Sequence, residues 1–121
     1  MTKKLERART ALLEAALQPH MWERALSAVA HASGAKVGQL IVRHEDGSIL
    51  THLLTGMPDG FAAEIEAFGL ADPSINPRAE LGLNAPPMTP VLDQDFVSAD
   101  ARKKLPIYAE MFEPSDVPFN C

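Results

Sequence analysis

Apolar residues recur at helical spacing over the first third of the chain. Between Lys3 and Leu17 they fall three and four residues apart among good helix formers, and Gln18-Pro19 interrupts the run. A second helical stripe extends from about Pro19 or Met21 to Ser33, and Gly34 after it is suited to a left-handed C-cap. The pattern therefore predicts two consecutive helices within residues 3–33.

From residue 35 to residue 55 the pattern changes to the runs of β-branched and apolar residues that are typical of strands. Two such runs flank Asp46-Gly47, a pair that tolerates positive φ at both turn positions, and this combination predicts a β-hairpin. Leu40 and Val42 share one face of the first strand because successive side chains alternate. Neither face is wholly polar, so both faces are expected to meet a helix, a ligand or a partner.

Residues 58–116 are expected to cover the hairpin with shorter helices and loops. Helical stripes are found at about 59–68, 76–81 and 98–112, the last divided by Pro106. The segment 83–92 contains three prolines, which leaves at most a short edge strand at 88–92. Residues 117–121 resemble the start of another strand. The chain as a whole is interpreted as one α+β domain over residues 1–121, with an antiparallel sheet that is incomplete.

Composition narrows the class of protein. The net charge of −5 and the short basic clusters argue against nucleic-acid contact by this segment. The charged N-terminus and the lack of an 18-residue apolar run argue against secretion by a signal peptide and against a membrane span. A single cysteine, Cys121, permits no internal disulfide, which favours a cytoplasmic location.

Catalytic and metal-binding signatures are absent from the sequence. The four histidines lack the spacing of metal ligands, and no serine lies in a G-x-S-x-G turn. Asp93 and Asp95 form a carboxylate pair, but acids just before a helix commonly favour the helix dipole. We therefore expect no enzyme, metal or cofactor. A small enzyme using Asp72 or the Asp93/Asp95 pair is the alternative.

One set of residues is a candidate ligand site. An aliphatic hairpin face, covered by an aromatic-bearing helix that is followed by a single acid, can form an apolar pocket with one polar anchor. The candidate residues are Leu40, Val42, Leu54, Phe61, Phe68 and Asp72. The alternative is that the same residues pack together as an ordinary core, which is the commoner arrangement.

The order of short motifs along the chain resembles the N-terminal sensory domain of LuxR-type transcriptional regulators. The motifs are L-x-A-A-L at 13–17, W-x-x-A-L at 22–26, T-G-M-P at 55–58, A-D-P at 71–73 and Y-x-E-M-F-x-P at 108–114. The resemblance covers nearly the whole chain. It implies a PAS/GAF-like fold, in which helices flank an antiparallel sheet.

The resemblance also implies a role for Asp72-Pro73. In acyl-homoserine-lactone receptors of the wider group, the aspartate of an Asp-Pro pair binds the amide of the signal molecule, and aromatic residues precede it. Phe68 precedes Asp72 here, but Asp59, Ala63 and Glu64 stand where a tryptophan and a tyrosine are expected. This departure from the motif argues against a lactone and leaves at most a different small apolar ligand. The DNA-binding helix-turn-helix of such regulators is absent from these residues.

The function expected from the sequence is that of a non-enzymatic sensory or regulatory domain, which regulates transcription through a region outside these residues. The alternative from another class is a protein-interaction or dimerisation module without a ligand. The confident strands number only two, and an unfinished sheet leaves unpaired backbone groups along its edges. Together with the Leu-rich first helix, this predicts a symmetric homodimer.

Overall fold

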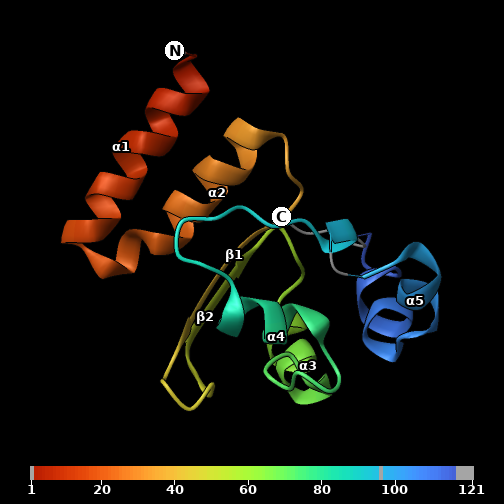
Figure 1. The fold of residues 1–121 in the computed structure, drawn as a ribbon. Coiled ribbons are helices and arrows are strands. Elements are labelled where there is room, and N and C mark those ends of the chain that lie inside the picture. The colour runs from red at the N-terminus through yellow and green to blue at the C-terminus, as the bar shows by residue number, and fades with distance from the viewer. Residues whose placement is uncertain (1, 96, 117–121) are drawn as a thin grey trace. The chain divides into compact units, whose positions relative to one another are not determined.

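The computed structural model of the protein describes residues 2–95 and 97–116. They form an α+β structure that divides into two compact units, Met1–Ala62 and Ala63–Cys121 (Figure 1). The first unit contains α1 (Lys3–Leu17), η1 (Pro19–Met21), α2 (Trp22–Ser33), β1 (Gly38–Arg43) and β2 (Ile49–Thr55). Helix α3 (Phe61–Phe68) begins at the end of this unit. The second unit continues with α4 (Pro77–Asn84), η2 (Asp93–Asp95), α5 (Ala99–Lys104) and η3 (Ile107–Phe112). The interpretation of residues 1–121 as one domain stays a prediction.

Helix α1 has the predicted bounds because both of its ends are set locally. Thr2 caps the N-terminus by accepting a hydrogen bond from the Leu5 backbone N–H at 3.3 Å. At the other end Gln18 is extended and precedes proline, which disfavours helical backbone. The face that α1 buries consists of alanines: Ala8, Ala11 and Ala15.

Helix α2 packs beside α1 and contacts both strands of the hairpin (Figure 1). Ala25 of α2 joins Ala11 and Ala15 in a small core, against which Trp22 is partly buried. The predicted C-cap is confirmed, since Gly34 has φ +72° and its N–H reaches back to the last turn. Small side chains at the α1–α2 contact let the two helices approach closely.

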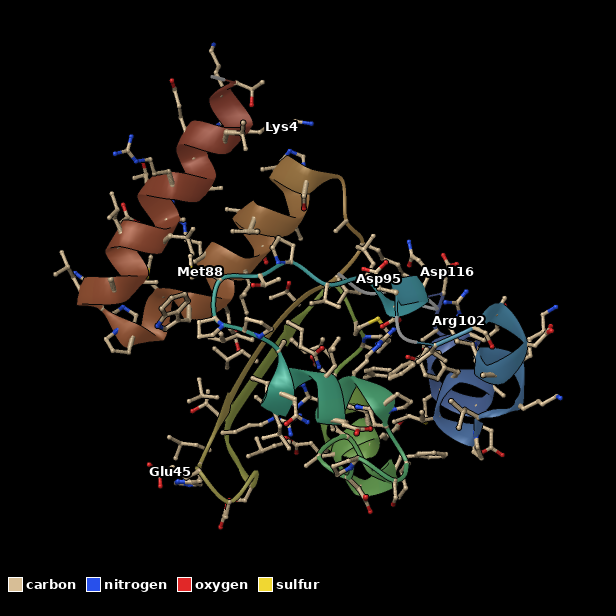
Figure 2. All side chains as sticks on the ribbon, viewed as in Figure 1. Lys4, Glu45, Met88, Asp95, Arg102 and Asp116 are labelled. Atoms are coloured by element: carbon tan, nitrogen blue, oxygen red, sulfur yellow. The ribbon has the colours of Figure 1, made fainter. Side chains whose placement is uncertain are left out.

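The predicted hairpin is confirmed, with β1 and β2 antiparallel. Its turn differs from the expected one, because only Gly47 of the Asp-Gly pair has positive φ, at +88°. The Gly47 N–H donates to the His44 carbonyl at 2.9 Å, so Glu45 and Asp46 are the central turn residues. Glu45 lies at the tip of the hairpin (Figure 2). This arrangement is a type I turn followed by a left-handed glycine.

The strand register shows which hairpin face meets α2. Leu40 lies opposite Leu53 and Gly38 lies opposite Thr55, so these residues share one face. A Cβ atom at Gly38 would lie 2.8 Å from the Leu26 carbonyl oxygen of α2. The face that carries Gly38, Leu40 and Val42 is therefore the face that α2 approaches.

In the second unit, the turn between α3 and α4 is held by both side-chain and backbone hydrogen bonds. The buried Asn76 donates to the Leu70 carbonyl at 2.8 Å and also accepts from the Arg78 N–H, which caps α4. The Asp72 carbonyl accepts from the N–H groups of Ile75 and Asn76. These bonds turn the chain at residues 71–77, between the two helices.

The prediction of an edge strand at residues 88–92 is wrong, because the structure has no strand there. Met88 has φ +60° and is fully exposed, so the backbone turns where a strand would have to be straight. Within the described residues the sheet has two strands. The strand expected at residues 117–121 lies outside the described residues.

The last helical region is divided at Pro106, as predicted. Ser98 caps α5 by accepting from the Ala101 N–H at 3.1 Å. After Pro106, η3 is a π-helical turn in which the Glu113 N–H donates to the Tyr108 carbonyl at 2.8 Å. Ile107, Tyr108 and Phe112 of this turn are buried and belong to the core of the second unit.

Candidate functional site

The candidate ligand-site residues on the hairpin do not share one face. Leu40 lies opposite Leu53, whereas Leu54 lies opposite Gln39, so Leu40 and Leu54 point to opposite sides. Val42 points to the same side as Leu40, toward α2. A ligand on one side of the hairpin therefore contacts Leu54 or the other two residues, but not all three.

The Leu54 side of the hairpin combines apolar and polar groups. Gln39 and His52 lie on this side together with Ile41, and their Nε2 atoms are 2.8 Å apart in a hydrogen bond. All of these side chains are partly buried. This face has the composition of a ligand-binding surface, with aliphatic contacts and a small polar pair.

A β-bulge disturbs the outer part of the hairpin. Val42 lies opposite Thr51 and Arg43 lies opposite Ile49, which leaves Leu50 without a partner in the register. Leu50 is 60% exposed. The residues of β2 therefore pair with β1 in regular alternation only from Thr51 onward.

The two candidate aromatic residues and the candidate acid lie around α3. Phe61 and Phe68 begin and end this helix and are partly buried, while Asp72 follows in the exposed turn. Phe61 belongs to the first compact unit, and Phe68 and Asp72 belong to the second. A pocket that these three residues form with one side of the hairpin stays a prediction.

Asp72 is already held by its own turn. Its Oδ1 atom accepts hydrogen bonds from the Ser74 hydroxyl at 2.6 Å and from the Ser74 N–H at 2.9 Å. These two bonds lower the pKa of the Asp72 carboxyl, because they favour the charged form. In the hairpin turn, Asp46 accepts the same two hydrogen bonds from Ser48. An aspartate bound by the serine two residues later therefore stabilises two turns of this chain.

A buried charged cluster in the second unit was not expected from the sequence. Arg78 of α4 donates through Nε and Nη2 to the carboxylate of Asp93, which is 1% exposed. The Arg78 Cζ atom lies 3.9 Å from the centre of the Phe112 ring and 5.3 Å from that of Tyr108. Cation–π contact therefore adds to the ion pair.

Tyr108 completes this cluster. Its ring meets Phe112 edge to face, with centres 5.0 Å apart, and its buried hydroxyl has no hydrogen-bond partner among the described residues. Burial raises the pKa of Tyr108, and the nearby charge of Arg78 partly opposes this effect. Asp93 was expected beside Asp95 at a helix start. Only the fold shows that Arg78 is the partner of Asp93, because no local motif connects residues fifteen positions apart.

The two N-terminal helices enclose an open groove with a volume of about 510 Å³. Its walls carry the basic residues Lys3, Arg7 and Arg24 and the acidic residues Glu6 and Glu14. Because both signs of charge are present, the groove matches no single class of charged ligand.

Four leucines of α1 are exposed. Leu17 is 85% exposed, Leu13 61%, Leu5 48% and Leu12 39%. We call these four residues the leucine face of α1. An apolar face of this kind marks a protein interaction site more often than an isolated exposed leucine does. Leucine is usually buried, and four exposed leucines on one helix depart from that rule.

Two further kinds of feature are absent from the described residues. No group of three or more histidine, cysteine, aspartate or glutamate residues there is arranged to hold a metal ion. None of the helices in residues 2–95 and 97–116 has the length and apolar character needed to cross a membrane.

Comparison of the chain with models of protein families, with curated proteins and with solved structures found no match.

Proposed function

We propose that this chain is a non-enzymatic sensory or regulatory domain of the PAS/GAF-like type, which works with the DNA-binding part of a LuxR-type regulator. The order of its motifs supports this function, as does an α+β structure in which helix α2 packs on an antiparallel hairpin. The domain acts through protein association.

The leucine face of α1 is the observation that carries the proposal. A regulatory domain controls another domain by changing which partner it binds. This requires a surface whose burial on binding lowers the free energy. Burying an exposed leucine side chain contributes about 1.5–3 kcal/mol. Four such residues on one helix give α1 the character of an interaction surface.

The contacts of the candidate acids support a regulatory function over the enzyme alternative. Asp72 is bound by Ser74 in an exposed turn, and Asp93 is neutralised by Arg78. A general acid or base must instead be able to exchange a proton with a substrate. Both carboxylates therefore have structural roles that account for their positions.

A reporter assay tests the proposal. The chain is fused to a helix-turn-helix domain that represses its operator only when two copies are held together. Repression is expected for the fusion and is lost for the Leu13→Glu/Leu17→Glu variant. The matched control is Leu50→Glu, which changes a leucine of similar exposure on the hairpin and leaves repression intact. Equal repression by all three fusions would exclude α1 as the regulatory surface.

A further inference from the structure

The side of the hairpin that faces away from α2 carries the single permanent charge of the two strands. Strands β1 and β2 contain one basic residue of the arginine or lysine type, Arg43, and no acidic residue. Gln39, Ile41 and Arg43 alternate with the residues that face α2, so these three side chains share the Leu54 side. This side of the hairpin therefore combines a cation with aliphatic surface.

Arg43 has a buried donor without a partner. Its Nη1 atom is buried and has no hydrogen-bond partner among the described residues. A buried donor has lost its bonds to water, so nearly all such groups in proteins are paired with an acceptor. Arginine pairs best with a carboxylate or a phosphate, because its planar guanidinium matches their oxygen atoms. The residue as a whole is only partly buried, so a ligand can reach its side chain from solvent.

The acids of the neighbouring turn do not supply the acceptor. Asp46 accepts hydrogen bonds from the hydroxyl and the N–H of Ser48. Glu45 is exposed at the tip of the hairpin (Figure 2). No hydrogen bond joins either acid to the buried Nη1 atom of Arg43. The acceptor that suits this donor is therefore one that a ligand brings.

The rest of the face gives the dimensions of such a ligand. Arg43 lies opposite Ile49, beside the turn, and Gln39 lies opposite Leu54, at the other end of the strand pair. Gln39 is four residues from Arg43, a rise of about 13 Å at roughly 3.3 Å per residue. Its hydrogen bond with His52 forms a polar pair without a permanent charge. A ligand along this face meets a cation first and then mostly aliphatic side chains.

We infer that the Leu54 side of the hairpin binds an apolar carboxylic acid, with its carboxylate on Arg43 and its chain along Ile41 and Leu54. The inference rests on the proposed sensory function and names the chemical class of the signal. A neutral apolar molecule would leave the Arg43 donor unpaired. A phosphate monoester carries close to two charges, which a single arginine does not balance.

Calorimetry with three probes of equal chain length tests the head group. Octanoate is expected to bind the full chain, and 1-octanol and octylammonium are expected to bind at least tenfold more weakly. The expected difference comes from the charge of the head group, because the apolar chain is the same in all three. An octanoate dissociation constant above about 1 mM overturns the inference. Equal or tighter binding of either other probe also overturns it.

Substitutions on the hairpin test the place of binding. Arg43→Gln is expected to weaken octanoate binding at least tenfold and to leave the weaker binding of 1-octanol unchanged. Arg43→Lys keeps the charge and is expected to retain the preference for octanoate. Leu54→Ala is expected to weaken the binding of both probes.

The matched control is Arg24→Gln, which removes an exposed arginine from α2 and is expected to leave octanoate binding unchanged. Circular dichroism confirms that each variant is folded. Octanoate binding that survives Arg43→Gln, or that Arg24→Gln abolishes, places the carboxylate elsewhere and overturns the inference.

The fusion assay distinguishes this inference from the proposed function. Octanoate is expected to change repression by the unsubstituted fusion and to have no effect on the Arg43→Gln fusion. Binding of octanoate at Arg43 without any change in repression contradicts the sensory function and leaves the binding site standing. A fusion that represses but does not bind octanoate overturns this inference and leaves α1 as the regulatory surface.

Discussion

Arg78 and Asp93 form a two-pronged ion pair in the interior of the second unit. The Arg78 Nε atom lies 3.0 Å from Oδ1 of Asp93, and Nη2 lies 2.5 Å from Oδ2. The Phe112 ring covers the face of the guanidinium, and the carboxylate binds its edge. The Arg78 side chain is 15% exposed and that of Asp93 is 1% exposed, so neither charge can be solvated fully if the other is removed.

The first prediction concerns this ion pair. Arg78→Met leaves the Asp93 carboxylate buried without a partner, and Asp93→Asn leaves the guanidinium without its counter-charge. Each change is expected to lower the free energy of unfolding by about 3–5 kcal/mol, measured by urea denaturation. The control is Asp95→Asn, at an exposed carboxylate two residues away, with an expected change within about 0.5 kcal/mol.

A double substitution distinguishes the contribution of the ion pair from the cost of leaving one buried charge unpaired. Arg78→Met/Asp93→Leu removes both charges and is expected to be more stable than Arg78→Met alone, because no buried charge is left unpaired. Additive losses in the double variant would show that the two side chains act independently.

The second prediction concerns the Tyr108 hydroxyl, which is buried without a partner among the described residues. Tyr108→Phe keeps the ring against Phe112 and removes the hydroxyl. We expect it to raise the free energy of unfolding by about 1 kcal/mol at neutral pH, because burying an unpaired hydroxyl costs about that much. A loss of 1 kcal/mol or more would instead mean that the hydroxyl is hydrogen-bonded, for example to a buried water.

The third prediction is a loss of stability at high pH. Burial raises the pKa of Tyr108 above its usual value of about 10. Below that pH both states keep the proton. Above it the unfolded chain loses the proton first, so stability falls from about pH 10 upward until the folded pKa is passed. Tyr108 is the only tyrosine, so absorbance near 295 nm follows its titration directly.

The control for this titration is the pH dependence of Tyr108→Phe. Lysines also titrate in this range, and their contribution is common to both proteins. The difference between the two stability curves is expected to begin at about pH 10 and to grow with pH. Parallel curves up to pH 11.5 would show that the tyrosine has the same pKa in the folded and unfolded states.

The fourth prediction tests the contact between α2 and the hairpin. Gly38→Ala places a Cβ atom 2.8 Å from the Leu26 carbonyl oxygen and 3.1 Å from the Thr55 hydroxyl, so one element must move. The expected cost is about 1–3 kcal/mol in urea denaturation. Gly82→Ala is the matched control. Its Cβ meets nothing within 4 Å inside α4, and it is expected to stabilise by about 0.5–1 kcal/mol.

The fifth prediction concerns the small apolar ligand. If one binds on the Leu54 side of the hairpin, a ligand at 100 times its dissociation constant stabilises the folded chain by about 2.7 kcal/mol, seen as a rise in melting temperature. Leu54→Ala is expected to reduce that rise. The control, Leu40→Ala on the opposite face, is expected to preserve it. A ligand-induced rise that depends on Leu40 and not on Leu54 would place the ligand on the α2 side.

The sequence by itself determined the helices and the hairpin where their ends depend on neighbouring residues. Thr2, Gly34, Ser98 and Pro106 set the limits of helices through bonds or backbone restrictions that reach at most a few residues. Periodicity located α1 and α2 for the same reason, since it reports which side chains share a face. These features depend only on residues close together in the sequence. They can therefore be recognised before the fold is known.

Only the tertiary structure decided which faces are covered and which distant groups meet. Periodicity gave α1 an apolar stripe, but packing against α2 buried its alanines and exposed its leucines, because small side chains allow the closer helix contact. The bulge at Leu50 and the opposite directions of Leu40 and Leu54 follow from the register of the strand pair. Arg78 meets Asp93 because the chain folds back between them. Such pairings depend on the free energy of the whole core, which no local pattern contains.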